Sequence, residues 1–174
     1  MRKISIITLG LLAILFFVGL FFYARYGGFN DPEIKITTVP VCTIAGKAYS
    51  GKMTSKEFGQ LFEVAEKLVK EGKVKGDIAG IFYTNPQKDT ATIEAFIGVL
   101  LKDSLQDLPE DYAIRTVAER KVVQAHIKAH VLVSPFVYPD IEEFAKENNI
   151  ELAHVPAVEI YPSTEEMFIQ VPVK

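Results

Sequence analysis

The sequence predicts an α+β fold in which a strand-helix-strand-strand unit occurs twice, preceded by an N-terminal transmembrane helix. Two observations predict the duplication: residues 79–83 (AGIFY) reappear as 157–161 (AVEIY), and residues 96–99 (FIGV) reappear as 168–171 (FIQV). Each copy stands at the end of a strand pattern, an amphipathic helix pattern and a second strand pattern. A repeat of this kind indicates one compact domain built from two related halves with pseudo-twofold symmetry.

The N-terminal segment predicts a membrane anchor. Residues 4–23 contain no charged side chain, and this run is about as long as the ~20 residues that cross a bilayer core. The alternative is a cleaved signal peptide, but the apolar core of such a peptide spans only ~7–15 residues. We therefore expect an anchor over residues 1–26 that contacts the lipid bilayer, a linker over 27–35 and a ligand-binding domain over 36–174.

Charges beside the apolar run bear on its orientation. Arg2 and Lys3 favour an N-terminus in the cytoplasm, whereas Arg25 and Lys35 on the other side weaken that bias. We predict a single-pass membrane protein whose soluble domain lies outside the cytoplasm. Cys42 is the single cysteine, so no intrachain disulfide is available to indicate the compartment.

The soluble part of the chain is acidic. Residues 1–28 hold three basic and no acidic side chains, so the remainder has 16 Lys and Arg against 22 Asp and Glu, a net charge of −6. Nucleic-acid-binding domains usually present a basic face. The composition therefore argues against a nucleic-acid partner, and it says nothing about a protein partner.

One amphipathic helix is predicted in each half of the domain. Thr54 and Glu57 form a capping box at the start of the first, and apolar residues recur at helical spacing from there to Gly72. The second helix covers 139–148; an earlier start near residue 132 stays open, in which case Pro135 would bend it. A turn at Asn85-Pro86 separates two of the strands, which are predicted over 39–49, 77–83, 92–101, 120–130, 157–161 and 167–173.

The helices should cover one face of a combined antiparallel sheet and leave the other face open. Two curved halves that meet at a pseudo-twofold axis would form a groove on the open face. We expect the ligand site in that groove.

A carboxylate marks the candidate site, because the two repeats differ at Ile81 and Glu159. A charge in an apolar strand is costly to bury unless it serves a purpose. Glu159 and Tyr161 share a strand face, and the repeat predicts that Ile81 and Tyr83 occupy the matching face of the other half. The alternative is that Glu159 is an ordinary solvated residue on the outside of its strand.

The candidate ligand-binding residues combine tyrosines with this carboxylate. Such a groove suits flat, apolar and often cationic molecules, because aromatic faces attract cations. The tyrosines also fit an ordinary role in a sheet, since strands favour them. The predicted ligand-binding residues are Tyr49, Ile81, Tyr83, His126, Glu159 and Tyr161.

Neither a metal nor a cofactor is predicted. His126 and His130 are four residues apart on a predicted strand, which places them ~13 Å apart, too far to share one ion. On a helix they would form an i, i+4 ligand pair, but no third ligand has a matching spacing.

Four segments carry a resemblance to a known family: residues 45–51 (AGKAYSG), 80–86 (GIFYTNP), 156–161 (PAVEIY) and 168–173 (FIQVPV). Taken in order, they resemble the GyrI-like small-molecule-binding family, over residues 36–174. The resemblance implies a GyrI-like fold and associates the glutamate at the position of Glu159 with cationic ligands. It also extends to a membrane-anchored receptor form of the family; the long acidic tail of that form does not follow Lys174, so we do not expect its receptor role.

Three functions remain open at this point, and whether the protein is an enzyme stays undecided. The first is a membrane-anchored module that binds hydrophobic or cationic aromatic small molecules. The second is a hydrolase of strained electrophilic compounds, a function that the resemblance implies for some family members, with Glu159 as general base and Tyr161 positioning the leaving group. The third is a membrane-tethered adaptor for an unidentified protein.

Overall fold

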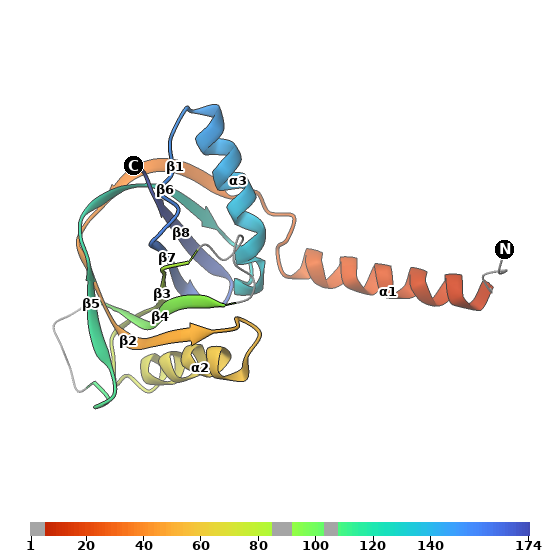
Figure 1. The fold of residues 1–174 in the computed structure, drawn as a ribbon. Helices are drawn as coiled ribbons and strands as arrows, with labels where there is room; N and C mark the ends of the chain where they lie inside the picture. Colours follow the sequence, from red (N-terminus) through yellow and green to blue (C-terminus); the bar gives the residue numbers. More distant parts are fainter. Residues whose placement is uncertain (1–5, 85–91, 103–107) are drawn as a thin grey trace.

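The computed structural model describes residues 6–84, 92–102 and 108–174 (Figure 1). The predicted turn at Asn85-Pro86 and the first two residues of the predicted bilayer contact, 4 and 5, lie outside these ranges. In the described residues, eight strands form one antiparallel sheet accompanied by three α-helices. The elements are α1 (Ile6–Arg25), β1 (Glu33–Val39), β2 (Cys42–Gly51), α2 (Lys56–Lys70), β3 (Gly76–Phe82), β4 (Ile93–Leu101), β5 (Ala113–Val117), β6 (Arg120–Ile127), a 3-10 turn (Val131–Val133), α3 (Ser134–Glu147), β7 (Ala157–Ser163) and β8 (Glu166–Pro172).

The predicted α+β fold with two related halves is confirmed, and each half has one strand more than expected. β1 to β4 with α2 form the first half, and β5 to β8 with α3 form the second. The two additional strands, β1 and β5, lie at the two edges of the sheet, whose order is β1-β6-β8-β7-β3-β4-β2-β5. Both carry exposed or half-buried side chains; β5 lacks apolar-polar alternation, whereas residues 33–37 of β1 (EIKIT) have it. β1 begins at Glu33, inside the segment predicted to be a linker.

Short connections make the sheet curl. β1 lies at one edge and β2 lies next to the opposite edge, yet only Pro40 and Val41 join them. Ala118 and Glu119 make the equally short connection from β5 to β6. A connection of two residues lets the ends of the strands lie at most about 10 Å apart, so the two edges must lie near each other. Figure 1 accordingly shows the strands following an arc, with α2 and α3 outside it.

Both α2 and α3 lie on the same face of the sheet, here called the helix face. Ala157 packs in a cluster with Phe58 of α2, and Tyr161, four residues further along β7, packs in a cluster with Ile141 of α3. Alternate residues of a strand share a face, so the two helices cover one face between them. Ser55 caps α2 by accepting a hydrogen bond from the backbone N–H of Phe58 at 3.1 Å, one residue later than the predicted start.

The opposite face, here called the inner face, is closed at its centre although no described helix covers it. Ile44, Ile81, Phe96 and Val158 form an apolar cluster there, and each of these side chains is at most 2% exposed. The curl of the sheet buries them against one another. The expectation that this face would be open was therefore wrong for its centre.

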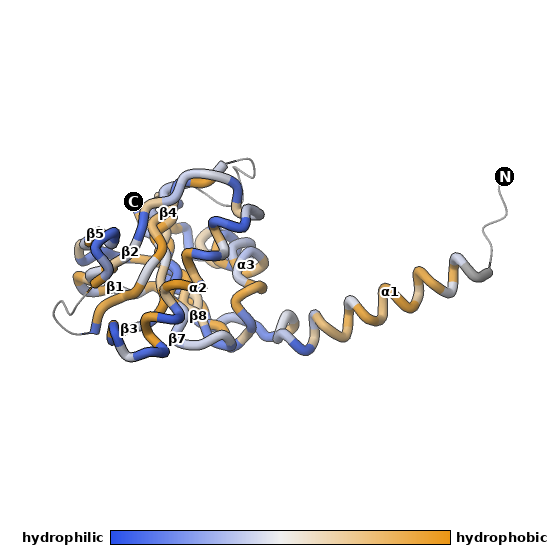
Figure 2. The backbone as a smooth tube through the Cα atoms, turned by 90° about the horizontal axis from the view of Figure 1, so that it is seen from below, coloured by the Kyte–Doolittle hydropathy of each residue, from blue (hydrophilic) through white to orange (hydrophobic). Residues whose placement is uncertain are grey.

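Helix α1 projects from the domain and is apolar along its length (Figure 2). By length and composition it can cross a membrane. Contacts at its end fix it to the domain: the backbone N–H of His130 donates to the Tyr26 carbonyl at 2.8 Å, and the two rings lie 4.7 Å apart. Asn30 donates a further hydrogen bond to the Lys128 carbonyl at 2.5 Å. The chain thus passes from helix to domain through residues that the domain itself holds.

Candidate ligand-binding site

A cavity of about 830 Å³ opens between α2 and α3 on the helix face. Most of its wall is apolar, and β3 and β7 form its floor. The groove was expected on the opposite face, and that expectation was wrong because the curled sheet fills that side with its own side chains. The wall residues used below are Phe62 from α2, Phe82 from β3, Ser134 and Tyr138 from α3, and Glu159 and Tyr161 from β7.

Glu159 is a buried charged group at the floor of this cavity, only 3% exposed; Asp77 of β3, which also lines it, is paired with Lys102 at 2.8 Å. The hydroxyl of Tyr138 donates to the Oε1 atom of Glu159 at 2.6 Å, and the hydroxyl of Tyr161 donates to its Oε2 atom. One donor comes from α3 and the other from β7. The carboxylate is therefore held in place through both of its oxygens.

Burial and hydrogen bonding act on the acidity of Glu159 in opposite directions. Desolvation raises its pKa above the ordinary value of 4.5 and outweighs the hydrogen bonds from Tyr138, Tyr161 and Ser134, which lower it. Burial, followed by the negative charge of Glu159, raises the pKa of Tyr138 and of Tyr161 well above 10. Both tyrosines therefore remain protonated hydrogen-bond donors at neutral pH.

The start of α3 positions two of these groups. Ser134 and Tyr138 are i, i+4 neighbours, so they project from the same side of the helix. Pro135 lies in the first turn, where its missing N–H is not needed. The helix thus takes the earlier of the two starts left open by the sequence, preceded by a short 3-10 turn. Sequence reasoning missed Ser134 and Tyr138 because the helix was expected only from residue 139, although their spacing continues to Ile141 and Ala145.

The predicted site residues fall on two faces of the sheet. Glu159 and Tyr161 line the cavity together. Tyr49 lies on the helix face and contacts Phe58, but its hydroxyl is hydrogen-bonded to Ser55 Oγ and donates to the Lys52 carbonyl, each at 2.7 Å. Tyr49 therefore supports the start of α2 and does not line the cavity. Its role in binding stays a prediction.

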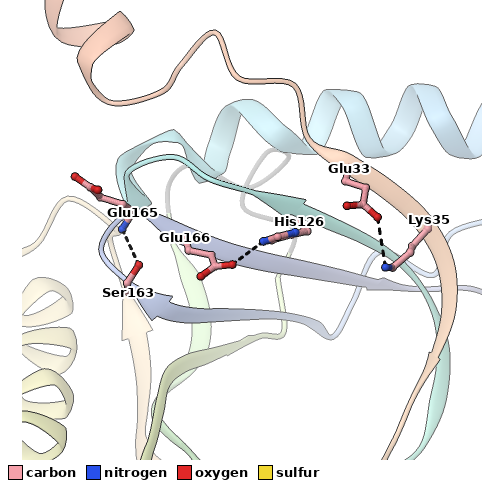
Figure 3. A network of polar contacts seen from close by, with 6 residues as sticks. All are labelled: Glu33, Lys35, His126, Ser163, Glu165 and Glu166. Atoms are coloured by element: carbon pink, nitrogen blue, oxygen red, sulfur yellow. Dashed lines mark hydrogen bonds and ion pairs between the residues drawn. The ribbon is translucent and has the colours of Figure 1, made fainter.

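Ile81, Tyr83 and His126 are placed away from the cavity. Ile81 is buried in the inner-face cluster, and Tyr83 is 41% exposed one residue beyond β3. His126 Nε2 lies 2.8 Å from Glu166 Oε1, and its ring stacks on Phe168 with centroids 4.3 Å apart. Figure 3 shows His126 and Glu166 pointing toward each other between β6 and β8. The expectation that Ile81 and Tyr83 occupy the face matching that of Glu159 was therefore wrong, and the binding roles of Ile81, Tyr83 and His126 stay predictions.

Strand register explains the error. The repeated segments 96–99 and 168–171 align Ile97 with Ile169. In the structure Ile97 lies opposite Gly80, and Ile169 lies opposite Glu159. The counterpart of Glu159 is thus Gly80, one residue before Ile81. A shift of one residue moves every side chain to the other face. With the corrected register, the counterpart of Tyr161 is Phe82, which lines the cavity.

These features define a class of protein: an α+β domain of two β-β-α-β-β units with a carboxylate at the floor of an apolar cavity. Residues 32–174 match the family of GyrI-like small molecule binding domains, and the chain belongs to this family. The predicted family is thereby confirmed. No curated protein sequence matches the chain.

Solved structures share the fold at low identity. An integron cassette protein of Vibrio cholerae, VCH_CASS2, is 16% identical with a TM-score of 0.57, over 81% of this chain and 95% of its own. SAV2435 bound to tetraphenylphosphonium is 15% identical with a TM-score of 0.52, over 82% and 94%. A structure described as a hydrolase from Listeria innocua is 13% identical with a TM-score of 0.56, over 88% and 98%. At these identities the similarity establishes the fold alone.

Proposed function

We propose that this protein is a membrane-anchored module that binds apolar organic cations in the cavity, with Glu159 as the counter-charge. The observation that carries the proposal is the pairing of Glu159 in the described structure: the buried carboxylate has hydroxyl donors and no ion pair. An unpaired buried charge is costly. A bound cation would offset that cost, whereas a neutral ligand would not.

The wall of the cavity suits the same class of ligand. The Phe62 and Tyr161 rings lie 5.9 Å apart in an edge-to-face arrangement, and Phe82 lies on the neighbouring strand. Aromatic faces attract cations by roughly 0.5–2 kcal/mol per contact. Glu63 of α2 also lines the cavity and adds to the attraction, whereas Glu66 beside it is already paired with Lys70 at 2.7 Å. A structural neighbour, SAV2435, is itself bound to a cation of this kind, tetraphenylphosphonium.

The test is a binding titration of the full chain in detergent with tetraphenylphosphonium. Replacing Glu159 by Gln keeps the shape and removes the charge, so we expect at least a tenfold loss of affinity, equivalent to about 1.4 kcal/mol. The matched control is Glu166→Gln, a carboxylate on the inner face that should leave affinity unchanged. Equal binding by the wild type and Glu159→Gln, or no binding by the wild type, would refute the proposal.

Hydrolysis is the second candidate function. A carboxyl whose pKa is raised by burial is suited to accept a proton from water near neutral pH. A structural neighbour is described as a hydrolase. In this reaction Glu159 would act as general base, and Tyr161 would orient the substrate oxygen. The test is turnover of a strained-ring electrophile, lost in both Glu159→Gln and Tyr161→Phe; saturable binding without product would leave only the binding function.

Anchoring is the remaining part of the proposal. The 20 residues of α1 rise about 30 Å, which matches the thickness of a bilayer core. We place the N-terminus in the cytoplasm and the domain outside it, as the basic residues before α1 suggest. Protease protection of the domain in sealed, right-side-out membranes tests this orientation: cleavage from outside supports it, and protection contradicts it.

A further inference from the structure

The three most exposed large apolar side chains outside α1 in the described residues gather beside the end of that helix. Leu132, Phe29 and Phe136 are 65%, 63% and 61% exposed. Tyr23, in the last turns of α1, connects two of them: its ring centroid lies 4.9 Å from that of Phe29 and 6.1 Å from that of Phe136. We call Phe29, Leu132 and Phe136 the apolar patch. Clustered exposed apolar groups of this kind mark an interaction surface.

The position of the patch favours a bilayer as its occupant. The domain holds the end of α1 through the bonds of Tyr26 and Asn30, so the patch cannot lie far from the surface that α1 crosses. In Figure 1, α1 meets the domain beside the start of α3, the helix that carries Phe136. Tyr23 and Tyr26 add the aromatic side chains that are typical of the membrane interface.

Polar groups beside the patch suit the headgroup layer. A cleft of about 650 Å³ lies between the end of α1 and the domain, and its lining includes Arg25, Lys128 and His130 together with Glu165 and Glu166. Arg25 is paired only loosely, at 4.0 Å from Glu165, and both side chains are largely exposed. Basic groups at this level are attracted to lipid phosphates. Apolar side chains, aromatic rings and basic groups, which are all typical of a bilayer interface, thus occur together beside the end of α1.

The apolar patch also forms part of the rim of the ligand cavity. Leu132 of the patch lines the cavity, and its neighbour Val131, which is not part of the patch, lines the cavity as well. The Val131 N–H donates to the Thr164 carbonyl at 3.2 Å, which ties this part of the rim to the turn between β7 and β8. A membrane that covers the patch therefore lies at the mouth of the cavity.

We infer that the apolar patch rests on the bilayer and that the cavity takes its ligand from the membrane. This inference rests on the proposed function and narrows its ligand class to amphiphilic organic cations dissolved at the lipid interface. Such molecules reach Glu159 past Leu132 without first entering bulk water.

The position of the patch can be measured directly, because the chain contains no tryptophan. Phe136→Trp in the full chain, reconstituted in phosphatidylcholine vesicles, should emit at short wavelength and be quenched by lipids brominated near the headgroup. Ile114→Trp on β5, at a position that is 40% exposed, is the matched control and should stay unquenched. Leu132→Trp repeats the test if Phe136→Trp fails to fold. Absence of quenching at position 136 would overturn the inference, as would quenching at 114 to the same extent.

The loading route has its own test, which separates it from the proposed function. Phe29→Asp combined with Phe136→Asp should slow the binding of tetraphenylphosphonium in vesicles about tenfold and leave the equilibrium affinity unchanged, since neither side chain lines the cavity. An unchanged rate would overturn the route from the membrane while leaving the binding function intact. Glu159→Gln should instead lower the equilibrium affinity, and failure of that result would refute the proposed function.

Discussion

The two faces of the sheet bury polar side chains in different ways. On the inner face, Gln170 donates to Gln124 at 3.1 Å, and the half-buried His126 pairs with Glu166. Each of these groups has a partner of matching chemistry. On the helix face, Glu159 has only hydroxyl donors among the described residues and lies at the floor of a cavity. The comparison shows two differences between a ligand site and a satisfied polar network: the buried charge in the site lacks an oppositely charged partner, and a cavity lies beside it.

Core packing should separate the two faces most strongly. Phe96 is 1% exposed in the inner-face cluster, with the Arg115 guanidinium 5.4 Å from the centre of its ring. Phe96→Ala should lower the free energy of unfolding by about 3–5 kcal/mol, because it leaves a cavity in a packed core. Chemical denaturation of the full chain in detergent measures this loss.

Phe62→Ala in the cavity wall is the matching change on the other face. Its side chain already borders empty space, so we expect a smaller loss of stability and weaker tetraphenylphosphonium binding. If Phe62→Ala were as destabilising as Phe96→Ala, the cavity would be a packed core in solution and the distinction between the faces would fail.

The second largest effect concerns the tyrosines on Glu159. Tyr138→Phe or Tyr161→Phe removes a hydrogen bond to the carboxylate. When Glu159 is ionised, we expect the free energy of unfolding to fall by about 1.5–3 kcal/mol. The pKa of Glu159 should rise further, and cation binding at neutral pH should weaken. Calorimetric titration at several pH values checks both effects. Tyr49→Phe is the control, and an equal loss of binding there would contradict the placement of Tyr49 outside the cavity.

The sequence predicted the fold class from apolar periodicity and the repeat, the family from the resemblance of four segments, and the shared strand face of Glu159 and Tyr161 from their spacing. It did not reveal β5, which has no apolar-polar alternation, and it missed β1 because the alternating residues 33–35 were assigned to the linker. Ile81 and Tyr83 were misplaced because residues 79–83 and 157–161 were aligned by similarity alone, which left them one residue out of register. The strand pairing of Gly80 with Ile97 corrects the alignment. Tyr138 was missed because a proline follows Ser134, and proline both starts and interrupts helices.

The acidity of Glu159 gives a prediction of intermediate size. Its pKa is raised by burial, so the folded state holds the proton more tightly than the unfolded chain. That contribution to stability is complete below the ordinary value of 4.5 and is lost as the pH rises through the raised pKa. As the pH rises from 4.5 through the raised pKa, the free energy of unfolding of the wild type should therefore fall relative to that of Glu159→Gln. The expected fall is about 1.4 kcal/mol for each unit by which the pKa is raised.

Cation binding should change in the opposite direction over the same pH range, because the ligand needs the ionised carboxylate. Unfolding curves and titrations of both proteins between pH 4 and 8 test the two trends together. Stability of the wild type that follows Glu159→Gln at every pH would show that the carboxyl is hydrated and not buried.

The smallest effect is expected at His126. Its contact with Glu166 is half-exposed, and such pairs contribute about 0–1 kcal/mol. His126→Gln keeps a hydrogen-bond donor near Glu166, so the free energy of unfolding should change by less than about 1 kcal/mol, and tetraphenylphosphonium affinity should not change at all. His126 belonged to the predicted binding residues, which makes this variant the sharpest check of the division between the faces. A clear loss of binding would mean that ligand also contacts the inner face, because no rearrangement limited to the helix face would make His126 matter.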